Sequence, residues 1–169
     1  MTTDTGTQLP TTLRVRALPS PLDLSKLAAM PPPSTKTITA DEENAFPCRR
    51  CLKDAAIGDQ MLLTPYDPFL GDSPYRQPGP IFVHLDPAAC KVYEPDDANG
   101  NRLPEQLRKR LLSVRAFGAD HCLVDADVVP GEQLAGVAER MMGDGAVEYI
   151  HVHNARPGCF AARIERVEA

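Results

Sequence analysis

The chain has 169 residues, a length that suits one globular domain, and 43% of its residues are apolar while 24% are charged. Its 18 basic and 23 acidic residues give a net charge of −5, so the overall charge argues against a nucleic-acid partner. No apolar run is long enough to predict a membrane span, and the first residues lack the pattern of a secretory signal. Together with an odd number of cysteines, five, this predicts a cytoplasmic protein with free or metal-bound thiols.

The first half of the chain predicts short strands and one short helix. Alternation of apolar and polar residues predicts a strand at residues 12–18, and residues 37–40 form a second, shorter strand. Between them, the segment LDLSKLAAM at residues 22–30 favours a helix, which the following three prolines end. Apolar runs predict two further strands at residues 60–66 and 81–85.

A proline-rich segment, DPFLGDSPYRQPGP at residues 67–80, separates the last two of these strands. Connections of this length are uncommon inside compact domains and often carry function. Four prolines restrict the unfolded segment, so ordering it costs less entropy than for a flexible loop. Tyr75 and Arg76 are therefore candidate ligand contacts, and a plain surface loop is the alternative.

Two helices are expected in the second half. The segment PEQLRKRLL at residues 104–112 has proline in its first turn, and residues 131–142 are amphipathic. Strands and helices mix without a regular alternation, which predicts an α+β fold: a mainly antiparallel sheet with two hairpins in the C-terminal half and two to three helices. We expect residues 1–11 to be a flexible N-terminal tail and residues 12–169 to form a single domain.

The segments SVRAF and HCLVDADVV predict the first hairpin. Aligning their apolar residues sets Val114 near Val124. This register places Arg115 on the same face as Asp125, diagonal to it. The pair is then either a solvated ion pair or the floor of a ligand pocket.

The segments VEYIHVHN and CFAARIERV predict the second hairpin, joined by the turn ARPG. His151 and His153 then share one face of a strand, about 7 Å apart, where they could hold a metal, act in catalysis or simply form hydrogen bonds. The turn sets His153 opposite Phe160, and Cys159 faces away from both histidines. This orientation argues against a thiol–imidazole pair unless a bulge reverses it.

The segment FPCRRCL carries Cys48 and Cys51. A redox dithiol of the thioredoxin type would follow a buried strand, and the preceding ADEENAFP does not predict one. The pair is also half of a zinc site, which His84 and Cys90 in HLDPAAC could complete. Such a site would be closed and structural, with the two intervening arginines balancing its negative charge. A turn with two buried thiols remains the third interpretation.

Several runs of the sequence resemble a known family when taken together in order. They are FPCRRCLKDAAIGDQMLL, GDSPYRQPGPIFVH, LLSVRAFGADHCLVDADVV and YIHVHNARPGCFAARIER. In this combination the chain resembles the uncharacterised bacterial family known as domain of unknown function 1203, over about residues 12–167. The resemblance implies membership of a family and no particular activity.

Two hypotheses about the function follow, one for a binding module and one for an enzyme. No dinucleotide-binding, P-loop, zincin or nucleophile-elbow signature is complete, which favours a binding module for a small anionic ligand or a protein partner. Its expected contacts are Tyr75, Arg76, Arg115 and Asp125. The alternative is a thiol- or metal-dependent enzyme that uses Cys48 or Cys159 with a nearby histidine, namely His84, His151 or His153.

Overall fold

The computed structural model describes residues 7–18, 34–95 and 101–168, and within them the fold consists of two antiparallel sheets with few helices. The five-stranded sheet has the order β1-β8-β7-β5-β6 and the three-stranded sheet the order β2-β3-β4. The strands are β1 (Leu13–Arg16), β2 (Lys36–Thr39), β3 (Gln60–Tyr66), β4 (Gly79–His84), β5 (Leu111–Phe117), β6 (Leu123–Pro130), β7 (Tyr149–Asn154) and β8 (Phe160–Arg166). In these ranges, no helix has both the length and the apolar character needed to cross a membrane.

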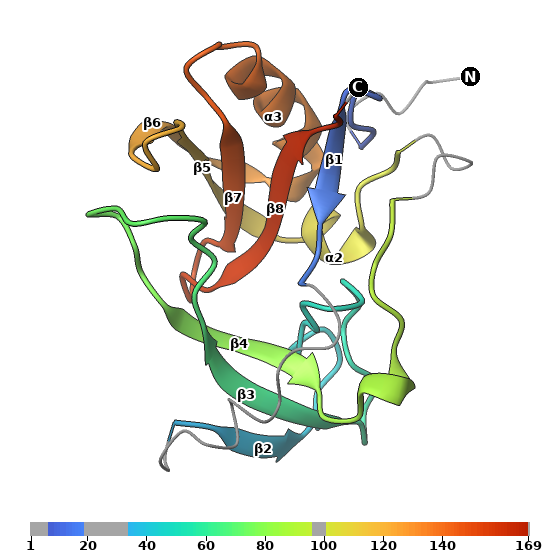
Figure 1. Ribbon diagram of the computed structural model, residues 1–169. Coiled ribbons are helices and arrows are strands. Elements are labelled where there is room, and N and C mark those ends of the chain that lie inside the picture. Colours follow the sequence, from blue (N-terminus) through green and yellow to red (C-terminus); the bar gives the residue numbers. More distant parts are fainter. Residues whose placement is uncertain (1–6, 19–33, 96–100, 169) are drawn as a thin grey trace, which may run out of the picture.

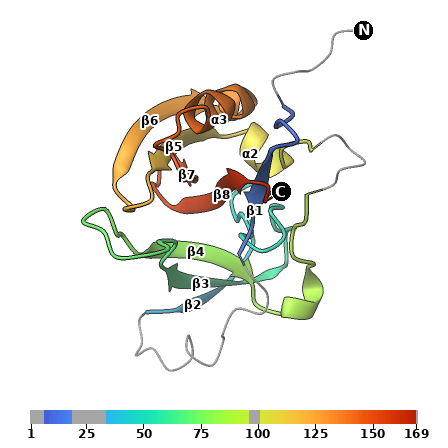
Figure 2. The ribbon, with the colours of Figure 1, turned by 45° about the horizontal axis from the view of Figure 1, so that its top comes forward.

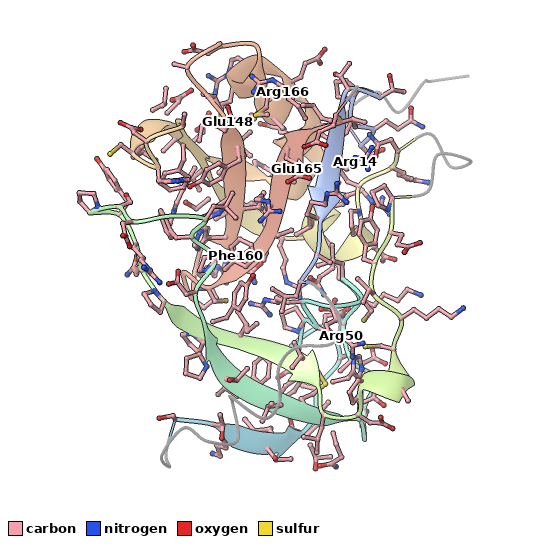
Figure 3. The ribbon with its side chains drawn as sticks, in the orientation of Figure 1. Arg14, Arg50, Glu148, Phe160, Glu165 and Arg166 are labelled. Carbon is pink, nitrogen blue, oxygen red and sulfur yellow. The ribbon has the colours of Figure 1, made fainter. Side chains whose placement is uncertain are left out.

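The elements are arranged in three layers. Helix α3 (Leu134–Met142) covers one face of the five-stranded sheet, and the other face is turned toward the three-stranded sheet (Figures 1 and 2). The two sheets contact each other through β8 and β4, near the beginning of β8 (Figure 1). Phe160 lies at that point (Figure 3), and its ring is 5.8 Å from the ring of Tyr66.

Strand β7 is the centre of the larger sheet, and all six of its residues are buried. A strand covered on both faces must carry apolar residues on each side, which removes the usual alternation with polar positions. Ile150 and Val152 pack into the main core beneath α3. His151 and His153 point the other way, into a group of aromatic rings. The second hairpin has His153 opposite Phe160, as the sequence predicts, but a bulge between Val152 and His153 shifts the register beyond this pair, so that Val152 lies opposite Ala162.

The helix expected at residues 104–112 is much shorter than predicted. Helix α2 has only one turn, Glu105–Arg108, and Leu111 already belongs to β5. Leu112 is fully buried as a strand residue, opposite Asn154 of β7. Sheet pairing and burial thus override the local helix propensity of this segment. The helix expected at residues 131–142 forms, as a 3-10 turn at Gly131–Gln133 followed by α3.

The register expected for the first hairpin is wrong. Val114 lies opposite Asp127, not near Val124, and Arg115 lies opposite Ala126. Arg115 and Asp125 consequently occupy opposite faces of the sheet. The error comes from aligning apolar residues, because β6 is an edge strand and leaves part of its apolar surface in solvent.

The two aspartates of β6 find their partner on α3. Arg140 donates to Asp125 at 2.9 Å and to Asp127 at 3.3 Å. This ion-paired arrangement lets carboxylates lie on the helix side of the sheet, where the sequence alone predicts apolar residues. Val128 of the same strand remains 58% exposed on the other side.

The three-stranded sheet has a core of its own. Met61, Ile81 and Val83 pack there with Cys48 and Cys51 from the preceding turn. The main core beneath α3 is a separate cluster. The molecule therefore has two apolar centres, one for each sheet, within a single chain of this length.

Two expectations concern the N-terminal part. Residues 7–9, predicted to belong to a flexible tail, pair with residues 101–103, and Leu9 is only 3% exposed. This part of the tail is therefore packed against the domain. The helix predicted at residues 22–30 lies outside the described residues.

Candidate metal centre and groove between the sheets

A tight turn presents Cys48 and Cys51 on the same side. The amide of Cys48 donates to the carbonyl of Lys53, and the amide of Leu52 donates back to the carbonyl of Cys48, each at 3.0 Å. Leu52 has a positive φ of 52°, which costs a non-glycine residue about 1–2 kcal/mol. Its side chain is only 2% exposed and reaches the main core, and this burial offsets the strain.

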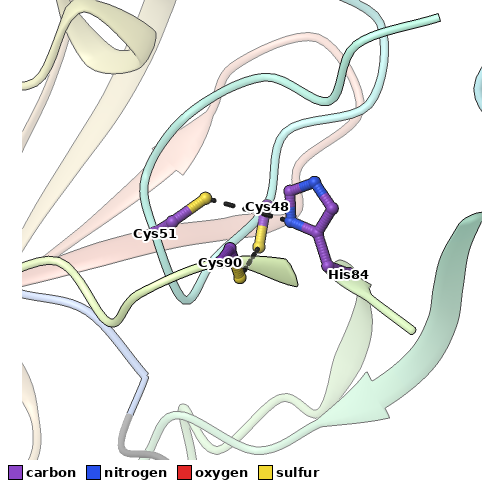
Figure 4. A group of neighbouring side chains, drawn as sticks. All are labelled: Cys48, Cys51, His84 and Cys90. Carbon is purple, nitrogen blue, oxygen red and sulfur yellow. Dashed lines mark hydrogen bonds between the residues drawn. The ribbon is translucent and has the colours of Figure 1, made fainter. Parts of the chain in front are cut away.

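The segment around β4 brings two more potential ligands to the turn. Cys48 forms a parallel bridge with Phe82, which sets the turn beside β4. His84 is the last residue of that strand. A 3-10 turn at Pro87–Ala89 follows, capped by the Asp86 carboxylate, which accepts from the amide of Ala88 at 2.9 Å. Cys90 comes directly after this turn and points back toward His84 and the two cysteines (Figure 4).

The four side chains form a compact cluster of three sulfurs and one imidazole nitrogen. All four ligand atoms lie within 4.8 Å of one another. The Sγ atoms of Cys48 and Cys90 are 4.0 Å apart, and Cys51 Sγ is 3.9 Å from His84 Nδ1. Ligands about 2.3 Å from one tetrahedral ion would be about 3.8 Å apart, so the geometry fits a single ion. The residues that the sequence singled out as a Cys3His set do come together.

Electrostatics concentrate negative charge within the cluster. A hydrogen bond from the Cys51 thiol lowers the pKa of Cys48 to about 4. The same hydrogen bond raises the pKa of Cys51, and burial raises the pKa of Cys90. Without a metal ion, the cluster thus favours one thiolate shared with neutral thiols. A divalent cation would favour the fully ionised set, because metal-bound cysteine is deprotonated.

Neighbouring groups orient the ligands. The carboxylate of Asp59 is 3.2 Å from His84 Nε2, which leaves Nδ1 directed at the sulfurs. A carboxylate on the second ring nitrogen is a common support for metal-bound histidine. Arg50 brings its Nη1 to 3.8 Å from Cys90 Sγ and donates to the carbonyl of Pro87 at 3.2 Å. Arg50 is thus placed to balance the charge of the thiolates, as expected.

Arg49 does not serve the cluster, contrary to the expectation for both arginines. Its side chain is 1% exposed and turns away toward the β7–β8 hairpin. Its guanidinium donates to the carbonyls of Phe160 and Pro47 at 2.7 and 2.6 Å and to Cys159 Sγ at 3.0 Å. Burial lowers the pKa of Arg49, and the nearby Cys159 opposes this effect.

Arg49 forms part of the wall of a groove between the two sheets, with a volume of about 670 Å³. This volume lies within the range of small-molecule sites. The β7–β8 turn borders the groove together with β4 and the end of α2. Its lining residues are Asn44, Ala45, Pro47, Arg49, Leu63, Pro80, Phe82, Lys109, Arg110, Leu111, Asn154, Ala155, Arg156, Pro157 and Cys159.

The candidate contacts from the proline-rich loop are divided between two places. Tyr75 and Arg115 line a pocket of about 220 Å³ together with His153. Arg76 instead pairs with two carboxylates of its own loop, those of Asp67 and Asp72. Asp125, which the expected register placed beside Arg115, faces α3 on the other side of the sheet. Of the four expected ligand contacts, the structure therefore brings together Tyr75 and Arg115.

Within the described residues, neither histidine of β7 forms a hydrogen bond with Cys159. His151 is fully buried among the rings of Phe69, Phe117 and Phe160, and in the described part of the chain neither of its ring nitrogens has a hydrogen-bond partner. The Nδ1 of His153 is 3.0 Å from the carbonyl oxygen of Gly158. Within the described residues, Cys159 is hydrogen-bonded by Arg49 and by Asn154, the latter at 3.5 Å. A Cys159–histidine pair therefore does not form.

Two contributors to these sites, Asp59 and the amide of Asn154, have no role in the sequence-based prediction, and the side chain of Arg49 has a different role from the one expected. Asp59 contacts His84 of the neighbouring strand, Asn154 contacts Cys159 across the β7–β8 turn, and Arg49 reaches the β7–β8 hairpin, so these contacts depend on how the strands pair. The only signal for Asp59 is its position directly before a strand that pairs with the one ending in His84. This position identifies Asp59 as a neighbour of His84 only when the register of the two strands is known.

Comparison with known proteins identifies the family but no activity. The family model described as protein of unknown function (DUF1203) matches residues 45–166, and the chain therefore belongs to this family. No curated protein and no solved structure matches the chain. The matched region includes all four residues of the Cys3His cluster and the whole lining of the groove except Asn44.

Proposed function

We propose that this member of the DUF1203 family is a zinc-stabilised module that binds a small anionic ligand between its two sheets. The Cys3His cluster supports the metal, because four ligand atoms from two distant segments lie within 4.8 Å of one another. The binding function is carried by one observation. Among the described residues, the buried guanidinium of Arg49 lines the groove and donates to two carbonyls and to the sulfur of Cys159 but to no carboxylate.

Zinc is the metal that the donor set favours. Three thiols and one imidazole match the closed tetrahedral sites in which zinc is structural, with no position left for a substrate. Such an ion would join the turn that carries Cys48 to the segment that carries His84 and Cys90. When bound, it would supply folding free energy and no catalytic chemistry.

The metal proposal is tested by measuring zinc in the purified protein. We expect one zinc ion per chain, a stoichiometric loss in Cys51→Ser and no loss in the matched variant Cys122→Ser, whose thiol lies outside the cluster. A strong chelator should lower the melting temperature by at least about 10 °C, because binding energy in such sites is folding energy. Unchanged melting after chelation, or equal zinc in both variants, would refute the proposal.

The binding proposal is tested with the zinc-loaded protein and a panel of organic anions matched to neutral analogues. A charge without a carboxylate partner inside a groove favours ligands that bring the missing negative charge. We expect anions to raise the melting temperature in a dose-dependent manner and neutral analogues to do so much less. If no anion raises it, the binding proposal fails even where zinc is present.

The thiol-dependent enzyme is the second hypothesis, and the geometry supports it less. Cys48 lies near His84 but shares it with two other thiols, and Cys159 has a guanidinium as its neighbour. Alkylation of the zinc-loaded protein at pH 6 separates the two hypotheses. A single fast cysteine would favour the enzyme, whereas slow labelling confined to Cys122 and Cys159 favours the binding module.

A further inference from the structure

The groove between the sheets has the two kinds of surface that an amphipathic ligand needs. Leu63 and Phe82 contribute apolar wall from the three-stranded sheet, and Pro157 contributes more from the β7–β8 turn. Phe82 is itself held by the ring of Phe46, whose centroid is 5.3 Å away. A hydrocarbon chain could lie against this wall without displacing a side chain that the core requires.

The groove has more positively charged side chains than nearby carboxylates to balance them. Arg49, Lys109, Arg110 and Arg156 line it, and none of its lining residues carries a carboxylate. Asp54 is not part of this lining and pairs with both Lys109 at 2.9 Å and Arg110 at 2.7 Å, so one carboxylate serves two cations. Among the described residues, Arg49 donates to two carbonyls and to the sulfur of Cys159, and no carboxylate accepts from it. Because the groove is partly buried, salt screens this excess of positive charge less than it would at the surface.

Arg156 is free to meet a ligand. It lies in the turn between β7 and β8 and is exposed. In the part of the chain that the structure describes, no side chain or carbonyl forms a hydrogen bond or ion pair with its guanidinium. A long cationic side chain at the rim of a groove can therefore close over an anion without first breaking another contact.

Asn154 gives an independent indication of a ligand. Its side chain is 6% exposed, it lines the groove, and its Oδ1 has no hydrogen-bond partner among the residues that the structure describes. Buried polar atoms are rarely left without a partner. Exchanging the amide oxygen and nitrogen would leave a donor unpartnered instead, so in either orientation one polar atom of this groove-lining side chain lacks a partner.

We propose that the groove binds an amphipathic organic anion. Its acid group lies between Arg49 and Arg156, a neighbouring polar group pairs with the amide of Asn154, and its hydrocarbon part packs on Phe82 and Leu63. This inference depends on the proposed binding function and names its site and ligand class. Carboxylates and phosphate monoesters share the required chemistry.

The test is calorimetric titration of the zinc-loaded full chain with matched probes. N-octanoylglycine carries an acid, an amide and a hydrocarbon chain; octanoate and octyl phosphate lack the amide; octanol lacks the charge; inorganic phosphate lacks the chain. We expect N-octanoylglycine to bind most tightly, and octanol and inorganic phosphate at least about tenfold more weakly. The order of octanoate and octyl phosphate identifies the preferred acid group.

Variants locate the site. Arg156→Gln should weaken binding of N-octanoylglycine about three- to tenfold, and Asn154→Asp, which keeps the shape but adds a negative charge, at least about tenfold. Arg140→Gln is the matched control, because Arg140 lies on α3 away from the groove. Arg156 is exposed in a turn, so its variant tests the site even if Asn154→Asp changes the fold.

Three results would overturn the inference, and the second of them leaves the proposed binding function intact. Equal binding of octanol and octanoate would show an apolar site without anion recognition. Anion binding that is lost in Arg115→Gln but kept in Arg156→Gln and Asn154→Asp would place the ligand in the Tyr75–Arg115 pocket and leave the binding function intact. Failure of every probe, including the full panel of anions, would overturn both.

Discussion

Arg49 and Arg50 are neighbours in the chain, but the turn directs them to different sites. The Arg50 side chain lies toward Cys90 and the potential metal, whereas that of Arg49 crosses to the β7–β8 hairpin. One turn thus links the Cys3His cluster to the groove, because both arginines follow Cys48 directly. An ion that fixes Cys48 and Cys51 would also fix the position of the guanidinium that lines the groove.

His151 gives a prediction about pH. Burial, followed by the nearby charges of His153, Arg163 and Arg115, lowers the pKa of His151 from 6.5 to about 3. Between these values the unfolded chain binds a proton that the folded chain does not, so stability falls as the pH drops below 6.5. When the pH is lowered from 7 to 5, the free energy of unfolding should therefore fall by about 2 kcal/mol less in His151→Phe than in the wild type.

Urea unfolding of both zinc-loaded proteins at the two pH values measures this difference. Contributions from carboxylates and from the metal site are common to both proteins and cancel in the comparison. The phenyl ring of the variant would lie in a site already lined by Phe69, Phe117 and Phe160, so the variant should fold. An identical loss of stability in both proteins would mean that His151 is not held neutral by its surroundings.

At the scale of elements, the junction between α2 and α3 depends on Gly131. A Cβ atom on this residue would lie 1.9 Å from the carbonyl oxygen of Leu107 and 2.7 Å from that of Arg108. These atoms belong to the backbone and cannot move aside without shifting α2. The close approach also allows the amide of Gly131 to donate to the carbonyl of Arg110 at 2.7 Å.

Gly131→Ala should therefore lower the free energy of unfolding by more than about 2 kcal/mol. Gly136→Ala is the matched control within α3, where a Cβ atom meets nothing within 4 Å. There the same substitution should raise stability by about 0.5–1 kcal/mol, because alanine favours a helix more than glycine does. Thermal or urea unfolding checks both variants, and a Gly131→Ala protein as stable as the wild type would show that α2 can move away from this position.

The sequence predicts elements best where one local pattern decides them. The strands of the second hairpin and the amphipathic α3 follow from periodicity, and the Cys3His set follows from spacing because ligands of one ion must converge. Leu111 and Leu112 are predicted as helix residues because local helix propensity does not take into account the pairing of their strand, β5, with β7. The predicted face of Asp125 is wrong because its partner, Arg140, comes from an element fifteen residues later.

At the scale of the molecule, the chain has two hydrophobic cores that lie next to each other. The main core lies under α3, and the smaller one packs around Cys48, Met61 and Ile81. Leu52 extends from the cysteine turn into the main core, while Phe160 extends from β8 into the smaller one. No periodicity within one element predicts that a chain of this length divides its core in this way, since the division depends on which strands pair.

This division predicts how metal loss spreads through the fold. The smaller core contains Cys48 and Cys51, with Cys90 packed against it, so removing the ion would leave three thiols to be packed at its centre. We expect chelation to speed amide exchange at least about tenfold in residues 46–55 and in strands β2, β3 and β4. Strands β5 and β7 should keep their protection, because the main core contains none of the ligands.

Hydrogen exchange followed by mass spectrometry measures this directly. Zinc-loaded Cys122→Ser, whose missing thiol lies outside the cluster, is treated with the same chelator as a control and should respond as the wild type does. Selective exposure of the smaller sheet would show that the metal stabilises one core and, through Arg49, one wall of the groove. Equal loss of protection in both sheets would instead mean that the two cores unfold as one cooperative unit. The groove would then depend on the metal only through global stability, and partial zinc loading would change the fraction of folded protein but not the ligand affinity of the folded fraction.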